Sequence, residues 1–234
     1  MTKIRIGTIA ARALALGGLL ISAQAHAIPI GNTQGTVEFP DGAISLADEV
    51  VDYQPGLEGA APTSPYQGAF NATGLPDYSG ANTCADQASC TFVSLGVGGS
   101  LTLRFTDNLL TGSGNSDDDL HIFEIGPDVE DTDVYISSDG ATFFSVGSVG
   151  GSVSSIDIDA FGYGIGDTFG YVRLVDVASE GGTSGITVGA DIDAVGAITT
   201  VPSVPVSVPE PSTLLLLGAG LIGIGYRRRC LPQR

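Results

Sequence analysis

The feature that most constrains the fold is a series of short stretches in which apolar and polar residues alternate. Leu101, Leu103 and Phe105 alternate with polar residues in one stretch, and Leu120 and Ile122 do so in the next. A period of two places the apolar side chains of a β-strand on one face, where they can enter a core. No comparable helical period occurs between the two chain ends, so the pattern predicts an all-β protein.

Turn signals separate these stretches at fairly regular intervals. Val134 and Ile136 are followed by Asp139-Gly140 and then by a second apolar stretch, which predicts a β-hairpin. The nearly continuous apolar run at 169–177 is typical of a central strand, and residues 186–194 alternate again. Short, evenly spaced strands favour a single β-sandwich or jelly roll, which we place at residues 91–198.

The regions on either side of this core have a different composition. Residues 28–90 are rich in Gly, Pro, Asn and Asp, and predict an N-terminal extension of edge strands and loops. Cys84 and Cys90 lie close together in an exported chain, which predicts a disulfide. Residues 199–207 alternate Val with Pro and Ser and predict an extended stalk.

The charge is distributed very unevenly along the chain. The formal net charge is -17, but seven of the nine basic residues lie near the two ends, leaving Arg104 and Arg173 between them against 25 acids. Such a field repels nucleic acid and attracts cations, so we expect no nucleic-acid partner. A solubilising surface and a cation-binding surface are both compatible with this charge.

The N-terminal residues 1–27 have the organisation of a secretory signal peptide. A basic start is followed by an apolar stretch and by the small-x-small sequence Ala25-His26-Ala27. We therefore expect a signal helix, export by Sec-type machinery, and cleavage by signal peptidase before Ile28.

The C-terminal apolar run at 213–226 is short for a membrane anchor. Its roughly 14 residues would span about 21 Å as a helix, against about 30 Å of hydrocarbon in a bilayer. Arg227, Arg228 and Arg229 follow it and are expected to remain on the cytoplasmic side. The run predicts a short transmembrane helix.

The order of these C-terminal elements resembles the PEP-CTERM sorting domain. Its characteristic parts are Val208, Pro209, Glu210 and Pro211, then the apolar run, then the arginines, all within residues 208–234. The resemblance implies a Gram-negative-type host that makes exopolysaccharide, and an exosortase-like enzyme that acts near Pro209–Pro211. It also implies an inner-membrane-anchored precursor whose product reaches the cell surface or the extracellular matrix.

The strand region is similar to domains found in other PEP-CTERM surface proteins. The similarity lies in SLGVGGSLTLRF, in the acidic loop before DLHIFE, and in VYISSDGATFFSVG. It implies a galactose-binding-like jelly roll, an architecture shared by many carbohydrate-binding modules.

One acidic loop has the composition of a calcium site, because calcium prefers six to eight hard oxygen ligands. The candidate ligands are Asp107, Asn115, Asp117, Asp119 and Glu124. The loop is not an EF-hand, since Leu120 and Gly126 occupy the positions that require glycine and glutamate. A calcium site and a solvated loop tip both fit this pattern.

Three further acidic pairs follow the strand period and are expected on solvent faces, because buried unpaired carboxylates are costly. The pairs are Asp131 with Asp133, Asp157 with Asp159, and Asp191 with Asp193.

The sequence offers little for catalysis. His121 is the one histidine after the signal peptide, no lysine follows Lys3, and no G-x-S-x-G motif occurs. Tyr163 is a candidate sugar-stacking residue on a loop. We expect a non-catalytic exported surface or matrix protein associated with exopolysaccharide or biofilm. The alternatives are a calcium-dependent carbohydrate-binding module and, less favoured, a glycoside-active enzyme.

Overall fold

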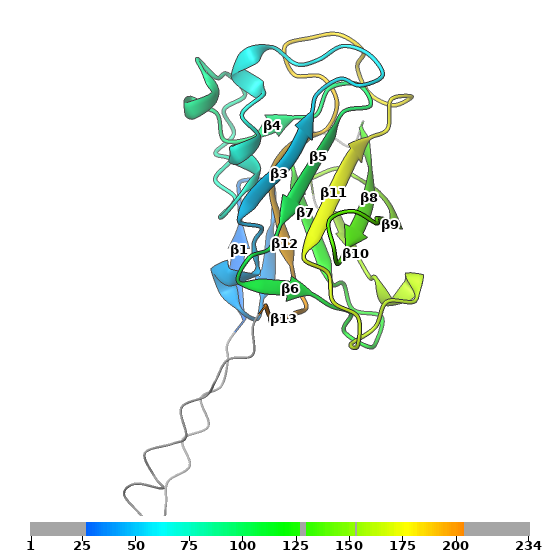
Figure 1. Ribbon diagram of the computed structural model, residues 1–234. Coiled ribbons are helices and arrows are strands. Elements are labelled where there is room, and N and C mark those ends of the chain that lie inside the picture. The colour runs from blue at the N-terminus through cyan, green and yellow to red at the C-terminus, as the bar shows by residue number, and fades with distance from the viewer. Residues whose placement is uncertain (1–26, 127–129, 153, 204–234) are drawn as a thin grey trace, which may run out of the picture.

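Two antiparallel sheets face each other across a shared apolar core in the computed structural model, which describes residues 27–126, 130–152 and 154–203 (Figure 1). The predicted all-β sandwich is confirmed. The predicted signal peptide, apart from Ala27, lies outside the described residues, as do the transmembrane run and the sorting motif. Among the described residues, no helix has the length and apolar character needed to cross a membrane.

The first sheet has five strands in the order β3-β5-β11-β8-β9, all antiparallel. β11 is its central strand, as the apolar run at 169–177 predicts. The strands are β3 (Glu49–Gln54), β5 (Ser100–Arg104), β8 (Asp131–Ser137), β9 (Phe144–Gly150) and β11 (Tyr171–Asp176).

The second sheet has four strands in the order β10-β7-β12-β4, also antiparallel. Residues 186–190 of the alternating 186–194 segment precede β12 instead of extending it, and Ile186 is exposed. The strands are β4 (Val93–Ser94), β7 (Leu120–Glu124), β10 (Ser154–Ile156) and β12 (Asp191–Ala197).

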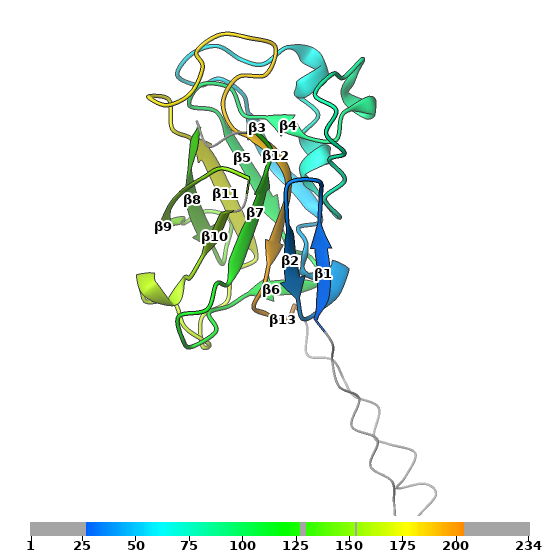
Figure 2. The ribbon, with the colours of Figure 1, turned by 180° about the vertical axis from the view of Figure 1, so that it is seen from behind.

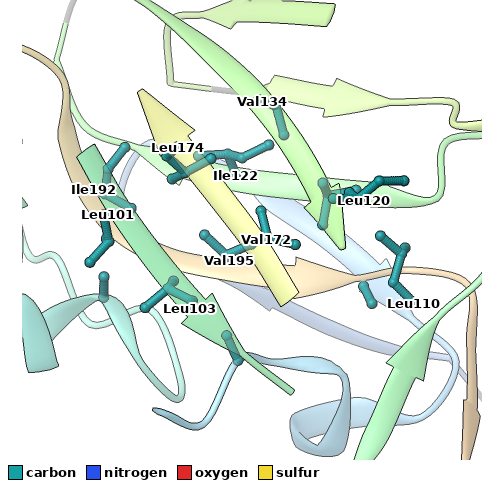
Figure 3. Packing of buried hydrophobic residues seen from close by; sticks show 14 of the residues in the cluster. Leu101, Leu103, Leu110, Leu120, Ile122, Val134, Val172, Leu174, Ile192 and Val195 are labelled. Carbon is teal, nitrogen blue, oxygen red and sulfur yellow. The ribbon is translucent and has the colours of Figure 1, made fainter. Parts of the chain in front are cut away.

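The core lies between the sheets and is built from the alternating positions (Figure 3). The five-stranded sheet contributes Leu101, Leu103, Val134, Val172 and Leu174, and the four-stranded sheet contributes Leu120, Ile122, Ile192 and Val195, all fully buried. Removal of this apolar surface from water is the main favourable term for folding, at about 25 cal/mol per Å².

A hairpin of β1 (Ile28–Gly31) and β2 (Thr36–Phe39) covers the outer face of the four-stranded sheet (Figure 2). The Phe39 ring packs 6.1 Å from the Phe123 ring, centroid to centroid. Gly196 allows this approach, because a Cβ there would lie 2.6 Å from Cε1 of Phe39. Both faces of β7 are therefore buried, and all five of its residues are buried.

Apart from this hairpin and the edge strand β3, the N-terminal extension consists of loops and single 3-10 turns, and part of it forms a small second core. The Cys84–Cys90 disulfide forms as predicted and packs with Tyr66, Tyr78 and Phe92. The turns are η1 (Gly42–Ser45), η2 (Ser64–Tyr66), η3 (Ala69–Ala72) and η4 (Gln87–Ser89).

A two-stranded ladder closes one end of the sandwich. β6 (Asn108–Leu110) pairs with β13 (Thr200–Pro202), so part of the segment predicted to be a stalk is instead a strand. The amide of Thr111 also donates a hydrogen bond to the carbonyl of Thr199. β1 begins and β13 ends at this lower end of the view in Figure 1.

The predicted β8–β9 hairpin is confirmed, with a longer turn than a two-residue connection. Gly140 has a φ of 72° in this turn, and Asp139 Oδ1 accepts hydrogen bonds from the amides of Ala141 and Thr142. These bonds lower the pKa of Asp139, because they favour its charged form.

Removal of the disulfide is expected to lower the free energy of unfolding by about 2 kcal/mol, because it closes a short loop of the unfolded chain. The test is equilibrium urea unfolding of the full-length chain with Cys84→Ala and Cys90→Ala together. Reductant should destabilise the wild type by a similar amount and leave the double variant unchanged. Equal stability of the oxidised wild type and the double variant would contradict a stabilising disulfide.

Candidate functional site

The five predicted calcium ligands do not come together in the structure. Asp107 lies in the turn before β6, where burial and the neighbouring Asp48 charge raise its pKa. Glu124 is at the far end of β7 from Asp119, about 17 Å away at roughly 3.3 Å per residue. Asn115 and Asp117 are exposed in the connection between β6 and β7.

Asp119 is instead held at the start of β7 by both its backbone and its side chain. Its amide donates to the carbonyl of Ile156, and its carbonyl accepts from the amides of Ile198 and Thr199. Its Oδ2 accepts a hydrogen bond of 3.0 Å from the amide of Ile158. The residue is 0 % exposed, and its buried Oδ1 makes no hydrogen bond of normal geometry.

The partners of Asp119 in space are Asp157 and Asp159. Ile156, the last residue of β10, pairs with Leu120, the first residue of β7. Asp157, which follows β10, is therefore a neighbour of Asp119, which precedes β7. One carboxylate oxygen from each of Asp119, Asp157 and Asp159 lies within 4.8 Å of the other two. We refer to these three residues as the triad. Asp157 and Asp159 belong to a pair predicted to lie on a solvent face, and both are half-buried.

The loop from Thr111 to Asp119 folds over the triad. Asp159 Oδ2 accepts hydrogen bonds from the amide of Gly114, at 2.9 Å, and from the hydroxyl of Ser113, at 3.3 Å. A Cβ on Gly112 would lie 2.7 Å from the same Asp159 oxygen, so this close approach requires glycine. Burial raises the pKa of Asp119, and the nearby Thr199 and Ser113 hydroxyls and the Ile158 amide oppose that rise.

No basic side chain of the described residues neutralises the triad. Arg104 forms an ion pair with Glu49, 3.4 Å between Nη1 and Oε2. Arg173 lies over the ring of Phe143 and donates to the hydroxyl of Thr102. These are the two Lys or Arg residues of the sequence between residues 28 and 203.

His121 does not supply a positive charge there. It is buried on β7, with Nδ1 2.8 Å from the hydroxyl of Ser155, and burial lowers its pKa to about 4. It is therefore neutral at physiological pH.

Three aromatic side chains lie on two segments, Phe161 and Tyr163 on and just after the turn that contains Asp159, and Phe144 at the start of β9. The turn η5 (Asp159–Phe161) begins with a triad residue and ends with Phe161, which is 47 % exposed. Tyr163 is half-buried, 5.9 Å from the ring of Phe144 and 5.2 Å from that of Phe169. We call Phe144, Phe161 and Tyr163 the aromatic strip. Tyr163 thus packs partly against the edge of the core. Phe144 and Phe161 are the more exposed rings of the strip.

A second group of acids lies elsewhere, around Asp191 on β12. The hydroxyl of Ser94 donates to its carboxyl. Burial first, and then the charges of Glu130 and Asp176, raise the pKa of Asp191 to about 7. Asp191, Glu130 and Asn82 line part of a cavity of about 180 Å³.

Asp193 is likewise buried instead of facing solvent, at a bulge that interrupts β12 between Ile192 and Ala194. Its carboxylate accepts hydrogen bonds from the Asn32 side chain and from the amides of Asp77 and Tyr78. Asp193 therefore ties the N-terminal extension to the sandwich.

Comparison with known proteins bears on the C-terminal end. Residues 207–229 match the PEP-CTERM protein-sorting motif. The match includes Val208 to Pro211 and Arg227 to Arg229, and it indicates an exported protein that is sorted to the cell surface by exosortase-type machinery. Searches of curated proteins and of solved structures found no match to the chain.

The raised pKa of Asp191 has a consequence for stability. Between about pH 4 and pH 7 the folded protein retains a proton that the unfolded chain has released, so this residue makes stability fall as pH rises. Asp191→Asn is expected to make the free energy of unfolding depend less steeply on pH. It should also raise the free energy of unfolding at pH 8, by up to about 4 kcal/mol.

The measurement is urea unfolding at pH 5 and pH 8, with Asp52→Asn, an exposed acid on β3, as the matched control. The control should follow the wild type at both values of pH. A variant less stable than the wild type at pH 8 would show that the charged form is not disfavoured by the fold.

Proposed function

We propose that this chain is an exported, non-catalytic β-sandwich protein that is sorted through its C-terminal motif and acts at the cell surface or in the extracellular matrix. The observation that carries the proposal is the PEP-CTERM match at residues 207–229. The acidic sandwich supports it, because a charge of this sign keeps an exposed domain soluble and separate from anionic surfaces.

The proposed route begins at the N-terminus. Sec-type machinery exports the chain, and signal peptidase removes residues 1–27. The apolar run at 213–226 holds the precursor in the inner membrane of a Gram-negative-type bacterium, with Arg227 to Arg229 on the cytoplasmic side. An exosortase-like enzyme then acts near Pro209–Pro211 and frees the domain for the surface or the matrix.

The hydrogen bonds and the disulfide that engage the histidine, the cysteines and the triad support a non-catalytic role. A nucleophile of the serine or cysteine type needs an adjacent general base. His121 is buried and bonded to Ser155, and Cys84 and Cys90 are joined in the disulfide. The triad belongs to a loop-anchoring arrangement, with hydrogen bonds from backbone amides to Asp119 and Asp159.

Mass spectrometry of the chain recovered from its host tests the sorting route. The wild type is expected to lose the segment after about Pro211, whereas a variant with Pro209, Glu210 and Pro211 all changed to Ala should keep Arg227–Arg229 and stay in the membrane fraction. Ser203→Ala, outside the motif, is the control and should be processed like the wild type. A wild-type chain that retains its arginine tail would contradict processing.

Carbohydrate binding, with a galactose-binding-like jelly roll as scaffold, is a second candidate function. The aromatic strip supports it, because exposed rings next to carboxylates can stack on sugar rings while the acids accept hydrogen bonds from hydroxyls. Phe161 lies over Gly147 of β9, and Phe144 of the same strand is 41 % exposed. Exopolysaccharide of the host is the proposed ligand.

Retention of the chain on immobilised host exopolysaccharide tests this function. Phe161→Ala and Phe144→Ala should each reduce retention several-fold, and Tyr163→Ala should reduce both retention and thermal stability. Phe70→Ala removes a ring that is 52 % exposed on η3, outside the aromatic strip, and should have no effect. Retention unchanged in both Phe161→Ala and Phe144→Ala would exclude the aromatic strip as the sugar site.

A further inference from the structure

We propose that Asp119, Asp157 and Asp159 form a calcium site that fastens the β6–β7 connection to the turn between β10 and η5. The site differs from the five-residue set that the loop composition suggests, since only Asp119 is common to both. It depends neither on C-terminal sorting nor on sugar binding, so its test is separate from theirs.

The spacing of the carboxylates fits an ion of the size of calcium. Calcium–oxygen distances are about 2.3–2.6 Å, so two oxygens bound to one ion lie at most about 5 Å apart. The three carboxylates meet this condition, with oxygens within 4.8 Å of one another. They come from two backbone segments that the β7–β10 ladder holds side by side, which makes the arrangement part of the fold.

The second observation is the buried oxygen of Asp119. The residue is 0 % exposed, and its Oδ1 makes no hydrogen bond of normal geometry, although its Oδ2 is bonded to the amide of Ile158. The Ser113 and Thr199 hydroxyls are near, but neither meets normal hydrogen-bond geometry to this oxygen, and a buried carboxylate oxygen without a well-formed hydrogen bond is costly. One oxygen of each of the other two carboxylates lies within 4.8 Å of an oxygen of Asp119, so a cation among the three would be a partner for the Asp119 carboxylate.

The charge of the triad favours a cation from solution. Three carboxylates within 4.8 Å repel one another, and among the described residues both arginines are engaged elsewhere, Arg104 with Glu49 and Arg173 with Phe143 and Thr102. A divalent ion converts that repulsion into attraction.

The ligand chemistry favours calcium over other metals. The triad offers carboxylate oxygens alone, which suit Ca²⁺ and Mg²⁺ and not the metals that prefer nitrogen or sulfur. Further oxygens are near, since the Ser113 hydroxyl lies 3.3 Å from Asp159 Oδ2 and 3.5 Å from the carbonyl oxygen of Asp117. Such a set suits the high and flexible coordination number of calcium better than the strict octahedron of magnesium.

Extracellular calcium modules bind with dissociation constants of about 10⁻⁴ to 10⁻³ M. We expect a value in this range. At 10 mM Ca²⁺ the melting temperature of the metal-free protein should rise by about 5 °C.

The experiment is isothermal titration calorimetry with CaCl₂, together with thermal melts, on the full-length chain in mild detergent after removal of metal with a chelator. Asp157→Asn and Asp159→Asn should each weaken calcium binding at least tenfold. Asp118→Asn, an exposed acid of the same loop outside the triad, is the matched control with the same loss of charge and should bind as the wild type does.

The difference in melting temperature between Asp157→Asn and the wild type provides a second readout, because calcium should reverse its sign. A purely structural role of Asp157 would not produce this reversal. Without metal, Asp157→Asn should melt at a higher temperature than the wild type, because it relieves carboxylate repulsion. In 10 mM Ca²⁺ it should melt at a lower temperature than the wild type, because it has lost a ligand. The Asn oxygen can still accept the hydrogen bond of the Ala160 amide, so this variant keeps the local fold.

Three results would overturn the proposal. The first is no heat and no change in melting temperature with 10 mM CaCl₂. The second is calcium binding that survives in both Asp157→Asn and Asp159→Asn or is weakened equally by Asp118→Asn. The third is an equal response to MgCl₂, which would replace calcium by a nonselective divalent site.

Discussion

The burial of β7 on both faces is the constraint on which the rest of the structure depends. Leu120 and Ile122 enter the core between the sheets, and Phe123 packs on the other side against Phe39 of the N-terminal hairpin. A central strand covered on both sides cannot shift its register without exposing apolar side chains. The packing of β7 therefore also determines the position of Asp119, the residue directly before the strand. The pairing of β10 with β7 in turn places Asp157 beside Asp119.

The buried acids show how a chain with very few basic residues accommodates its charge. Asp193 is satisfied by the Asn32 side chain and two backbone amides, and Asp176 by the amides of Gly98 and Ala190. Backbone amides thus take the place that Lys and Arg occupy in most proteins. The triad differs, because one oxygen of Asp119, its most buried member, accepts no hydrogen bond of normal geometry. That difference distinguishes a candidate ligand site from acids that only hold loops in place.

The spatial arrangement relates the proposed roles to one another. η5 and the β6–β7 connection lie at the lower end of the sandwich in Figure 1, the end at which β13 also lies. The triad, built on these two segments, thus lies at the same end as the β6–β13 ladder. The disulfide and the small core of Tyr66, Tyr78 and Phe92 belong to the N-terminal extension.

The sequence by itself determined the fold class, the β8–β9 hairpin, the central position of β11, the disulfide and the sorting motif, because each depends on local period, turn chemistry or short spacing. Only the tertiary structure decided which acids meet. Asp119 and Asp157 are far apart in the chain and become neighbours through strand register. The N-terminal extension buries Asp193, at the bulge in β12, on what simple alternation treats as a solvent face. Register and bulges depend on packing between distant segments, which no local pattern of residues encodes.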